Sequence, residues 1–180
     1  MRLPNPADLP RGELREIYLH WTGGGNGDIF DAYHFCVATD AAGTRAIATH
    51  DLRANMRDVR GGGAYAAHTH GRNSYAIGVA ICAMRDATPH DFGAAPMLEE
   101  QIELACALVA RLCSTYGIAL PAVRTHAEAA LEDGYFGCGG EERWDIARLR
   151  PAPGALASVE AKIVGDDLRA RVGRCARAGW

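Results

Sequence analysis

The sequence predicts an α/β fold: a single domain in which a mixed central β-sheet is flanked by helices. Three observations favour this class. Short apolar runs separated by glycine-rich turns are typical of strands, and residues 75–83 are apolar throughout, as in a strand buried on both faces. Residues 96–116 repeat apolar side chains at intervals of three and four, the pattern of a helix that packs on a sheet. The length of 180 residues suits one domain with a sizeable core.

The early strands are short and end at polar residues. Residues 16–22 form the first, which carries His20 and runs into the glycine-rich loop 23–27. Residues 33–38 form the second, and residues 44–49 are its expected hairpin partner. Because side chains alternate along a strand, at most one of Tyr33 and His34 faces a cleft. Taken alone, His20 is more often a packed core histidine than a ligand.

A long polar segment, residues 50–76, follows the hairpin. Loops of this length inside a compact domain are usually functional or disordered. His68 and His70 point to one side if the segment is extended, so a second metal pair is conceivable. Because no third ligand stands beside them, substrate contact or a solvated loop is the favoured interpretation.

The second half of the chain begins with the helix at 96–116, whose expected stop is Gly117. Residues 122–126 are predicted as a short strand that delivers His126, and residues 129–140 as a glycine-rich loop. We expect the core of the single domain, 1–180, to span about residues 13–150, with a C-terminal tail at 151–180. The tail is predicted to hold a weakly amphipathic helix through Val159, Ile163, Leu168 and Val172.

Composition and charge exclude several classes of partner. A net charge of −3 gives no basic footprint for nucleic acid or for an anionic membrane surface. No run approaches the roughly 18 apolar residues of a membrane span, and the N-terminus lacks the apolar centre of a signal peptide. The six cysteines form no CxxC pair and several lie inside apolar runs, which is typical of reduced thiols. We expect a monomer that is made in the cytosol.

Two imidazoles and one carboxylate lie near the ends of apolar runs: those of His20, His126 and Asp145. Two nitrogens and one oxygen, with one coordination position left open, are the usual donors of a catalytic zinc site. The open position admits the water that does the chemistry. The hypothesis is therefore a zinc hydrolase, although these residues lie too far apart in sequence for spacing alone to establish it.

Taken in order from about His20 to Leu149, the chain resembles the zinc-dependent N-acetylmuramoyl-L-alanine amidases of the type 2 family. These share a fold with phage amidase endolysins and peptidoglycan recognition proteins. The resemblance rests on five fragments in the family's order: Tyr18-Leu-His20-Trp-Thr22, Tyr33-His-Phe35, Asn73-Ser-Tyr-Ala-Ile-Gly-Val79, Thr125-His126-Ala-Glu128 and Arg143-Trp-Asp145. It favours the ligand interpretation of His20 over the core interpretation.

The resemblance implies hydrolysis of the amide bond between N-acetylmuramic acid and L-alanine in the peptidoglycan stem. It implies Zn²⁺ as cofactor, held by His20, His126 and Asp145. Tyr33 is then expected near the attacking water and the substrate carbonyl. Arg143 takes the place of a lysine that stabilises the oxyanion.

Other features of the resemblance refine this expectation. The cytosolic muropeptide-recycling branch has a glutamate at the position of Ala80, so the sequence is more similar to the phage-type variant. Cys138, Glu141 and Glu142 are alternative third ligands, and the Arg-x-Asp spacing favours Asp145 over them. The groove for stem peptide and glycan is expected to involve the glycine loops and four polar side chains: His68, His70, Arg72 and Asn73.

Several alternatives stay open at this point. A non-catalytic peptidoglycan-binding protein of the same fold would keep the groove without the metal. A wall peptidase would use Cys36 or Cys138 as nucleophile, and a metal-dependent deacetylase would release acetate. A phage endolysin, a prophage remnant, an effector delivered into rival cells and a recycling enzyme are all compatible with the sequence. In the preferred interpretation, the enzyme acts on the cell wall after release or delivery.

Overall fold

The computed structural model describes residues 3–137, 140 and 143–179. A five-stranded sheet runs through its centre in the order β3-β2-β4-β1-β5. Its strands are β1 (Glu16–Trp21), β2 (Phe35–Asp40), β3 (Gly43–Ala48), β4 (Ala76–Ile81) and β5 (Val123–Thr125). Strand β3 is antiparallel to β2, whereas β2, β4, β1 and β5 run parallel. The predicted mixed sheet of an α/β fold is confirmed.

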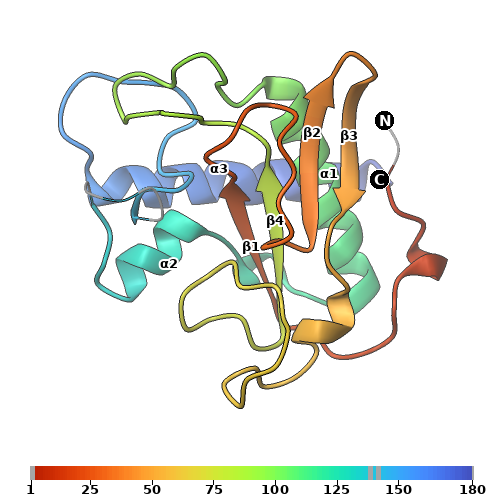
Figure 1. The fold of residues 1–180 in the computed structure, drawn as a ribbon. Helices are drawn as coiled ribbons and strands as arrows, with labels where there is room; N and C mark the ends of the chain where they lie inside the picture. Colours follow the sequence, from red (N-terminus) through yellow and green to blue (C-terminus); the bar gives the residue numbers. More distant parts are fainter. Residues whose placement is uncertain (1–2, 138–139, 141–142, 180) are drawn as a thin grey trace.

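Helices pack on both faces of this sheet. The described α-helices are α1 (Glu99–Tyr116), α2 (His126–Glu132) and α3 (Ser158–Arg177), and short 3₁₀ turns lie at Pro6–Asp8, Leu52–Asn55 and Leu120–Ala122. Helices α1 and α3 lie on one side of the sheet, and α2 also contacts the opposite face beside β1. Helices α1 and α3 pack against each other behind the sheet in Figure 1, while α2 follows β5 directly. The loop between β3 and β4 lies in front, and the face of the sheet opposite α1 is covered by this loop together with α2, whose Ala129 packs with Tyr18 and Ala76.

Side chains of β1 alternate between the two faces of the sheet, and only one of these faces contacts the main hydrophobic core. Ile17, Leu19 and Trp21 belong to the main hydrophobic core that includes the buried side of α1. Tyr18 and His20 are equally buried but point to the opposite face, as alternation requires. The sequence that builds the core therefore also delivers the histidine to the other side.

Strand β4 places small residues on the same face of the sheet as Tyr18 and His20. The core side of β4 is formed by Ile77, Val79 and Ile81, whereas Ala76, Gly78 and Ala80 alternate with them. A Cβ added to Gly78 would lie only 2.5 Å from Cγ of His68. Glycine at this position therefore allows the loop to approach the sheet closely.

Asn55 holds this long loop together from the inside. It is fully buried, and its amide nitrogen donates to the carbonyls of Ala66 (3.0 Å) and Asn73 (2.9 Å). Its amide oxygen accepts the N–H of Ala66 at 2.9 Å. This buried side chain thus connects two parts of the segment, where the sequence indicated only a long polar loop.

Helix α1 is confirmed, and its C-cap Gly117 has the left-handed φ of 69° that favours glycine. The predicted loop at 129–140 is wrong in its first part, because α2 continues to Glu132. The Thr125 hydroxyl accepts the N–H of Glu128 at 3.1 Å, and the Glu128 carboxylate accepts the N–H of Thr125 at 2.9 Å. This reciprocal capping box starts the helix at His126, and the helix continues into the segment predicted as a loop from residue 129.

The helix predicted in the tail is confirmed as α3, but only part of its expected apolar stripe faces the core. Leu168 and Val172 are buried, whereas Val159 and Ile163 are 56% and 61% exposed. Small residues occupy the contact face in the first half of the helix, with Ala161 and Gly165 buried. The close approach of α3 to α2 therefore depends on small side chains.

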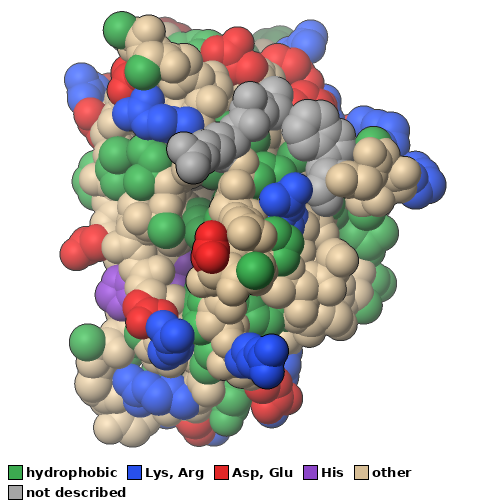
Figure 2. All heavy atoms as spheres, turned by 90° about the vertical axis from the view of Figure 1, so that its right-hand side faces the viewer, with side chains coloured by type: hydrophobic (Ala, Val, Ile, Leu, Met, Phe, Trp, Pro, Cys, Tyr) green, Lys and Arg blue, Asp and Glu red, His purple; other side chains and the backbone are tan. Residues whose placement is uncertain are grey.

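One face of the molecule carries charges of both signs, and the described cysteines form no disulfide. Figure 2 shows acidic and basic side chains interspersed on the face toward β3. No helix among the described residues combines the length and apolar character needed to cross a membrane. The described cysteines, at positions 36, 82, 106, 113 and 175, are free thiols, as predicted.

Candidate metal centre

The strand order brings together the ligands predicted from sequence. His20 is the second-last residue of β1, and His126 is the first residue of α2, directly after β5. Because β1 and β5 are parallel neighbours, their carboxyl ends meet at the same edge of the sheet. Asp145 reaches this edge from the turn after α2, and all three residues are buried.

The donor atoms converge on one point. Nδ1 of His20 lies 2.9 Å from Oδ2 of Asp145, and Nδ1 of His126 lies 3.2 Å from the same oxygen. Ligand atoms of tetrahedral zinc lie roughly 3.3 Å apart, given bonds of about 2.0–2.1 Å. The other carboxylate oxygen, Oδ1, accepts the backbone N–H of Trp21 at 2.7 Å, which fixes the carboxylate. The set of two imidazoles and one carboxylate can therefore hold one divalent ion.

The protonation states favoured by the surroundings are those of metal ligands. Burial lowers the pKa of His20 and so favours its neutral imidazole, although Asp145 opposes this shift. Burial raises the pKa of Asp145, but the bonds from His126 and His20 outweigh it, and the net pKa is lowered. A neutral imidazole and an ionised carboxylate are the forms that bind metal.

Two hydroxyl groups contact the imidazoles on their far sides. Oγ1 of Thr69 lies 3.3 Å from Nε2 of His20, and the hydroxyl oxygen of Tyr135 lies 3.1 Å from Nε2 of His126. Sequence reasoning missed both residues. The available signals were the place of Thr69 between two histidines and an aromatic residue in the glycine-rich loop at 135.

A cavity of about 250 Å³ opens beside the cluster. Its walls are formed by Trp21, Thr22, Tyr33, Ala67, His68, His126 and Asp145. The ring of Tyr33 packs 5.1 Å from that of His20, and its hydroxyl donates to the Trp21 carbonyl at 3.3 Å. Tyr33 therefore lies beside His20 in the wall of this cavity.

A larger cavity of about 840 Å³ lies next to it. Its walls are formed by His70, Gly71, Arg72, Asp133, Tyr135, Gly140 and Arg143. Arg143 is exposed here, in the wall of the larger cavity rather than of the smaller one. Tyr135 contacts both this cavity and His126, so it connects the open groove with the buried cluster.

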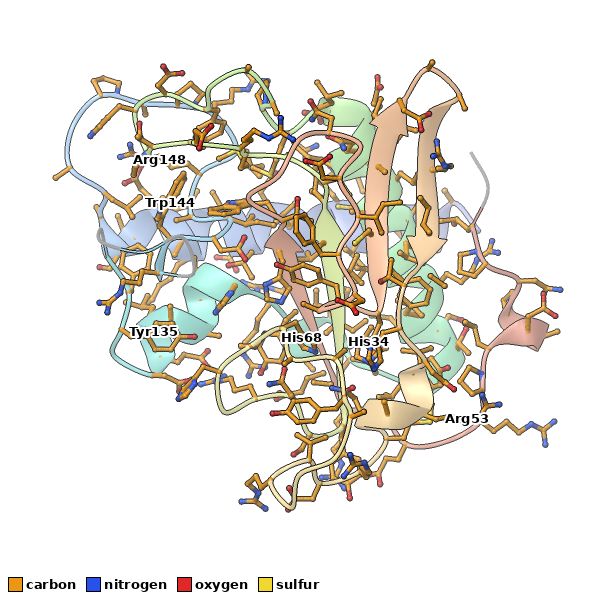
Figure 3. All side chains as sticks on the ribbon, in the orientation of Figure 1. His34, Arg53, His68, Tyr135, Trp144 and Arg148 are labelled. Atoms are coloured by element: carbon orange, nitrogen blue, oxygen red, sulfur yellow. The ribbon has the colours of Figure 1, made fainter. Side chains whose placement is uncertain are left out.

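The four side chains predicted to bind substrate have different surroundings. His70 is exposed in the large cavity, whereas His68 is buried beneath the loop beside His34, as Figure 3 shows. Asn73 is also buried, and its amide oxygen accepts the N–H groups of His68 (3.0 Å) and Thr69 (2.9 Å). Asn73 thus shapes the loop that holds Thr69.

Arg72 joins the two walls of the large cavity. Its guanidinium forms two bonds with the Asp133 carboxylate, at 2.7 and 2.6 Å, and one with Glu132 at 2.7 Å. These carboxylates lie at the end of α2, so Arg72 fixes the β3–β4 loop to that helix. The ion pairs raise the pKa of Arg72, with burial opposing.

The structure disfavours one alternative nucleophile. Cys36 is fully buried in a small apolar cluster with Ala38, Ala80 and Cys82, and its thiol donates to the Phe30 carbonyl at 3.4 Å. A sulfur enclosed in this way has no route to a polymeric substrate. The other proposed nucleophile and the alternative ligands, Cys138, Glu141 and Glu142, lie outside the described residues.

Fold and site together define an α/β protein with a buried His-His-Asp group, able to hold a metal, at the carboxyl ends of β1 and β5. Residues 10–141 match the family model described as N-acetylmuramoyl-L-alanine amidase, and the chain belongs to this family. Membership indicates peptidoglycan amidase activity. No curated protein gives a significant match. The matched range includes His20 and His126 but ends before Asp145, which the fold brings to them.

Proposed function

We propose that this protein is a zinc-dependent amidase that cleaves the bond between the lactyl group of N-acetylmuramic acid and L-alanine of the stem peptide. Family membership supports the substrate class and the bond. The observation that carries the metal-dependent part is the convergence of two Nδ1 atoms on one oxygen of Asp145. His126 and Asp145 line a cavity of about 250 Å³, which has room for water and a carbonyl group.

The reaction adds the hydroxyl of water to the lactyl carbonyl carbon and a proton to the nitrogen of L-alanine as the amide bond breaks. Zinc, when bound, supplies a Lewis acid for the carbonyl and lowers the pKa of water toward neutrality. Tyr33 stands at the cavity wall, where its hydroxyl can donate to the substrate carbonyl in place of the Trp21 carbonyl. The Arg143 guanidinium offers several N–H donors and supports the developing negative charge from the neighbouring wall.

The large cavity is the proposed groove for stem peptide and glycan. His70 and Arg143 offer polar groups from its two sides, and Arg72 holds the sides at a fixed separation. His68 and Asn73 support the loop from within. We propose that the enzyme works as a monomer on the cell wall, after release or delivery.

Intact sacculi test this proposal directly. We expect the purified protein with zinc to release stem peptides that begin with L-alanine, as detected by mass spectrometry. A chelator should abolish this release and added zinc should restore it. Acetate release would instead show a deacetylase, and cleavage within the peptide that resists chelator would show a peptidase.

Metal content gives an independent measurement. We expect about one zinc per chain in the wild type and far less in Asp145→Ala, because two imidazoles without a carboxylate make a weak site. Asp145→Asn is the matched variant, since its amide oxygen can still accept the Trp21 N–H. A wild-type protein that binds sacculi but contains no zinc would be a non-catalytic binder, and this result would contradict the proposal.

A further inference from the structure

The imidazole rings of the two candidate histidine ligands are turned in the same way relative to Asp145. Each presents Nδ1 to Asp145 and Nε2 to a hydroxyl oxygen, that of Thr69 or of Tyr135. A neutral imidazole that coordinates through Nδ1 carries its proton on Nε2. That proton needs an acceptor, because both rings are buried.

We propose that Thr69 and Tyr135 are positioning residues, whose hydroxyl oxygens accept the Nε2–H groups of His20 and His126 and thereby fix both Nδ1 atoms on the metal. This inference rests on the proposed metal-dependent function. It adds two residues that the sequence did not single out, each acting through a ligand rather than on the substrate. Such outer contacts set ring orientation and typically change metal affinity about 10–100-fold.

Thr69 is buried, and both its backbone and its side chain form hydrogen bonds that fix its position. It is 1% exposed, and its backbone N–H is bound by the Asn73 amide oxygen at 2.9 Å. Its hydroxyl also lies 3.0 Å from Nδ1 of His68. A hydroxyl has one proton to donate and two lone pairs. It can therefore accept from His20 and donate to His68, so that both buried contacts are satisfied.

Tyr135 follows α2, the helix that starts at His126. Its hydroxyl bonds the imidazole at 3.1 Å, and its ring lies 6.1 Å from the imidazole centroid in an edge arrangement. Figure 3 shows the residue alongside α2. The chain thus returns from the helix to support the first residue of that same helix.

Both positioning groups are neutral. Carboxylates in these places would add negative charge beside the metal, whereas Thr69 and Tyr135 add none. With two neutral imidazoles and one aspartate, a divalent ion keeps a net charge of about +1. The hydroxyl pair therefore orients the ligands while preserving the positive charge that activates a carbonyl.

The test compares zinc affinity in Thr69→Val, Thr69→Ser and Tyr135→Phe, measured by competition with a chelating dye. We expect about 10–100-fold weaker binding for Val and Phe, and recovery of most of the affinity by Ser, which keeps the hydroxyl. Tyr116→Phe is the matched control, because its hydroxyl bonds the Pro10 carbonyl, far from the cluster. Its zinc affinity should equal that of the wild type.

Folding and metal binding are separated by a second readout. The unfolding midpoint in chelator reports the stability of each variant without metal, and the added shift with zinc reports the site. The inference is supported if zinc raises the unfolding midpoint less in Thr69→Val and Tyr135→Phe than in the wild type, but not less in Thr69→Ser. Affinities within twofold of the wild type for both Val and Phe would overturn it.

The outcomes also separate this inference from the proposed function. A wild type that binds zinc but releases no stem peptide contradicts the amidase, while the variant affinities still decide the roles of Thr69 and Tyr135. A wild type that binds no zinc overturns both proposals.

Discussion

Gly78 sets the distance between the sheet and the loop that carries His68 and Thr69. Its φ is not left-handed, so the need for glycine is steric. The ring of His68 occupies the place where a Cβ would lie, with Cγ, Cδ2 and Cβ at 2.5 to 2.9 Å. Because Thr69 follows His68, a movement of this ring changes the support of His20.

Gly78→Ala should therefore destabilise the protein and weaken zinc binding together. We expect a loss of about 1–3 kcal/mol, the usual range for overpacking a buried site. Gly61→Ala is the control, because its Cβ would meet nothing within 4 Å. Urea unfolding and zinc competition measure both effects, and unchanged values for Gly78→Ala would contradict this steric role.

His34 carries a second residue-scale prediction, on pH. Burial lowers its pKa from an ordinary 6.5 to about 4, and its Nδ1 accepts the N–H of Gly78 at 3.0 Å. The folded state thus binds a proton less readily than the unfolded state. Its contribution is complete above pH 6.5 and is lost as the pH falls toward 4, on the order of 3 kcal/mol in all.

His34→Asn isolates this contribution, since the amide oxygen can keep the Gly78 contact without titrating. We expect the metal-free wild type to lose stability more steeply than His34→Asn between pH 6.5 and 4.5. Urea unfolding in chelator at a series of pH values measures the two slopes. Parallel curves would show that His34 does not titrate in this window.

At the scale of elements, α2 is held between β5 and α3 through Glu128. Arg169 of α3 donates to both carboxylate oxygens of Glu128, at 2.9 and 2.8 Å, and also to the Val123 carbonyl at 2.9 Å. A Cβ on Gly165 would lie 2.2 Å from the carboxylate. A glycine inside α3 therefore admits the side chain that caps α2.

Gly165→Ala and Gly173→Ala form a matched pair within this helix. Alanine normally stabilises a helix interior by about 0.5–1 kcal/mol over glycine, as we expect at Gly173, where the closest contact is an ordinary 3.4 Å. At Gly165 the clash should reverse the sign. Because α2 begins at His126, zinc affinity should also fall in Gly165→Ala alone, and equal unfolding midpoints for the two variants would refute this.

At the scale of the molecule, we propose that the tail belongs to the same domain as the core. Helix α3 packs on α1 over a shared core. Arg148, which follows Asp145 closely in the chain, bonds Glu160 of α3 at 2.7 and 2.9 Å. A chain ending at residue 150 would expose the part of α1 that packs against α3 and leave Glu128 without Arg169.

We expect this shortened chain to unfold at lower urea concentration and to bind zinc more weakly. The full-length variant Val159→Ser with Ile163→Ser is the control, since both side chains are exposed. It should match the wild type. A shortened chain as stable as the full one would place the tail outside the folding unit.

Periodicity made the sheet and α1 predictable, because alternation and three-four spacing are local signals. The ligands His20, His126 and Asp145 could be proposed from residue type and resemblance. Thr69 and Tyr135 could not, since their contacts depend on how two loops without periodic pattern return to the sheet. The first part of the 129–140 segment was misjudged because glycine content outweighed the capping signal Thr125-x-x-Glu128.

Asn55 has a consequence for recognition. Its side-chain amide hydrogen-bonds the backbone of Ala66 and Asn73, and so keeps the β3–β4 loop in one conformation before any glycan strand binds. A preorganised wall loses little conformational entropy when a ligand docks, so contact energy is retained as affinity. The β3–β4 loop should then keep its shape when peptidoglycan binds. Selectivity among cell-wall polymers should depend on how well each one matches the shape that the loop already has.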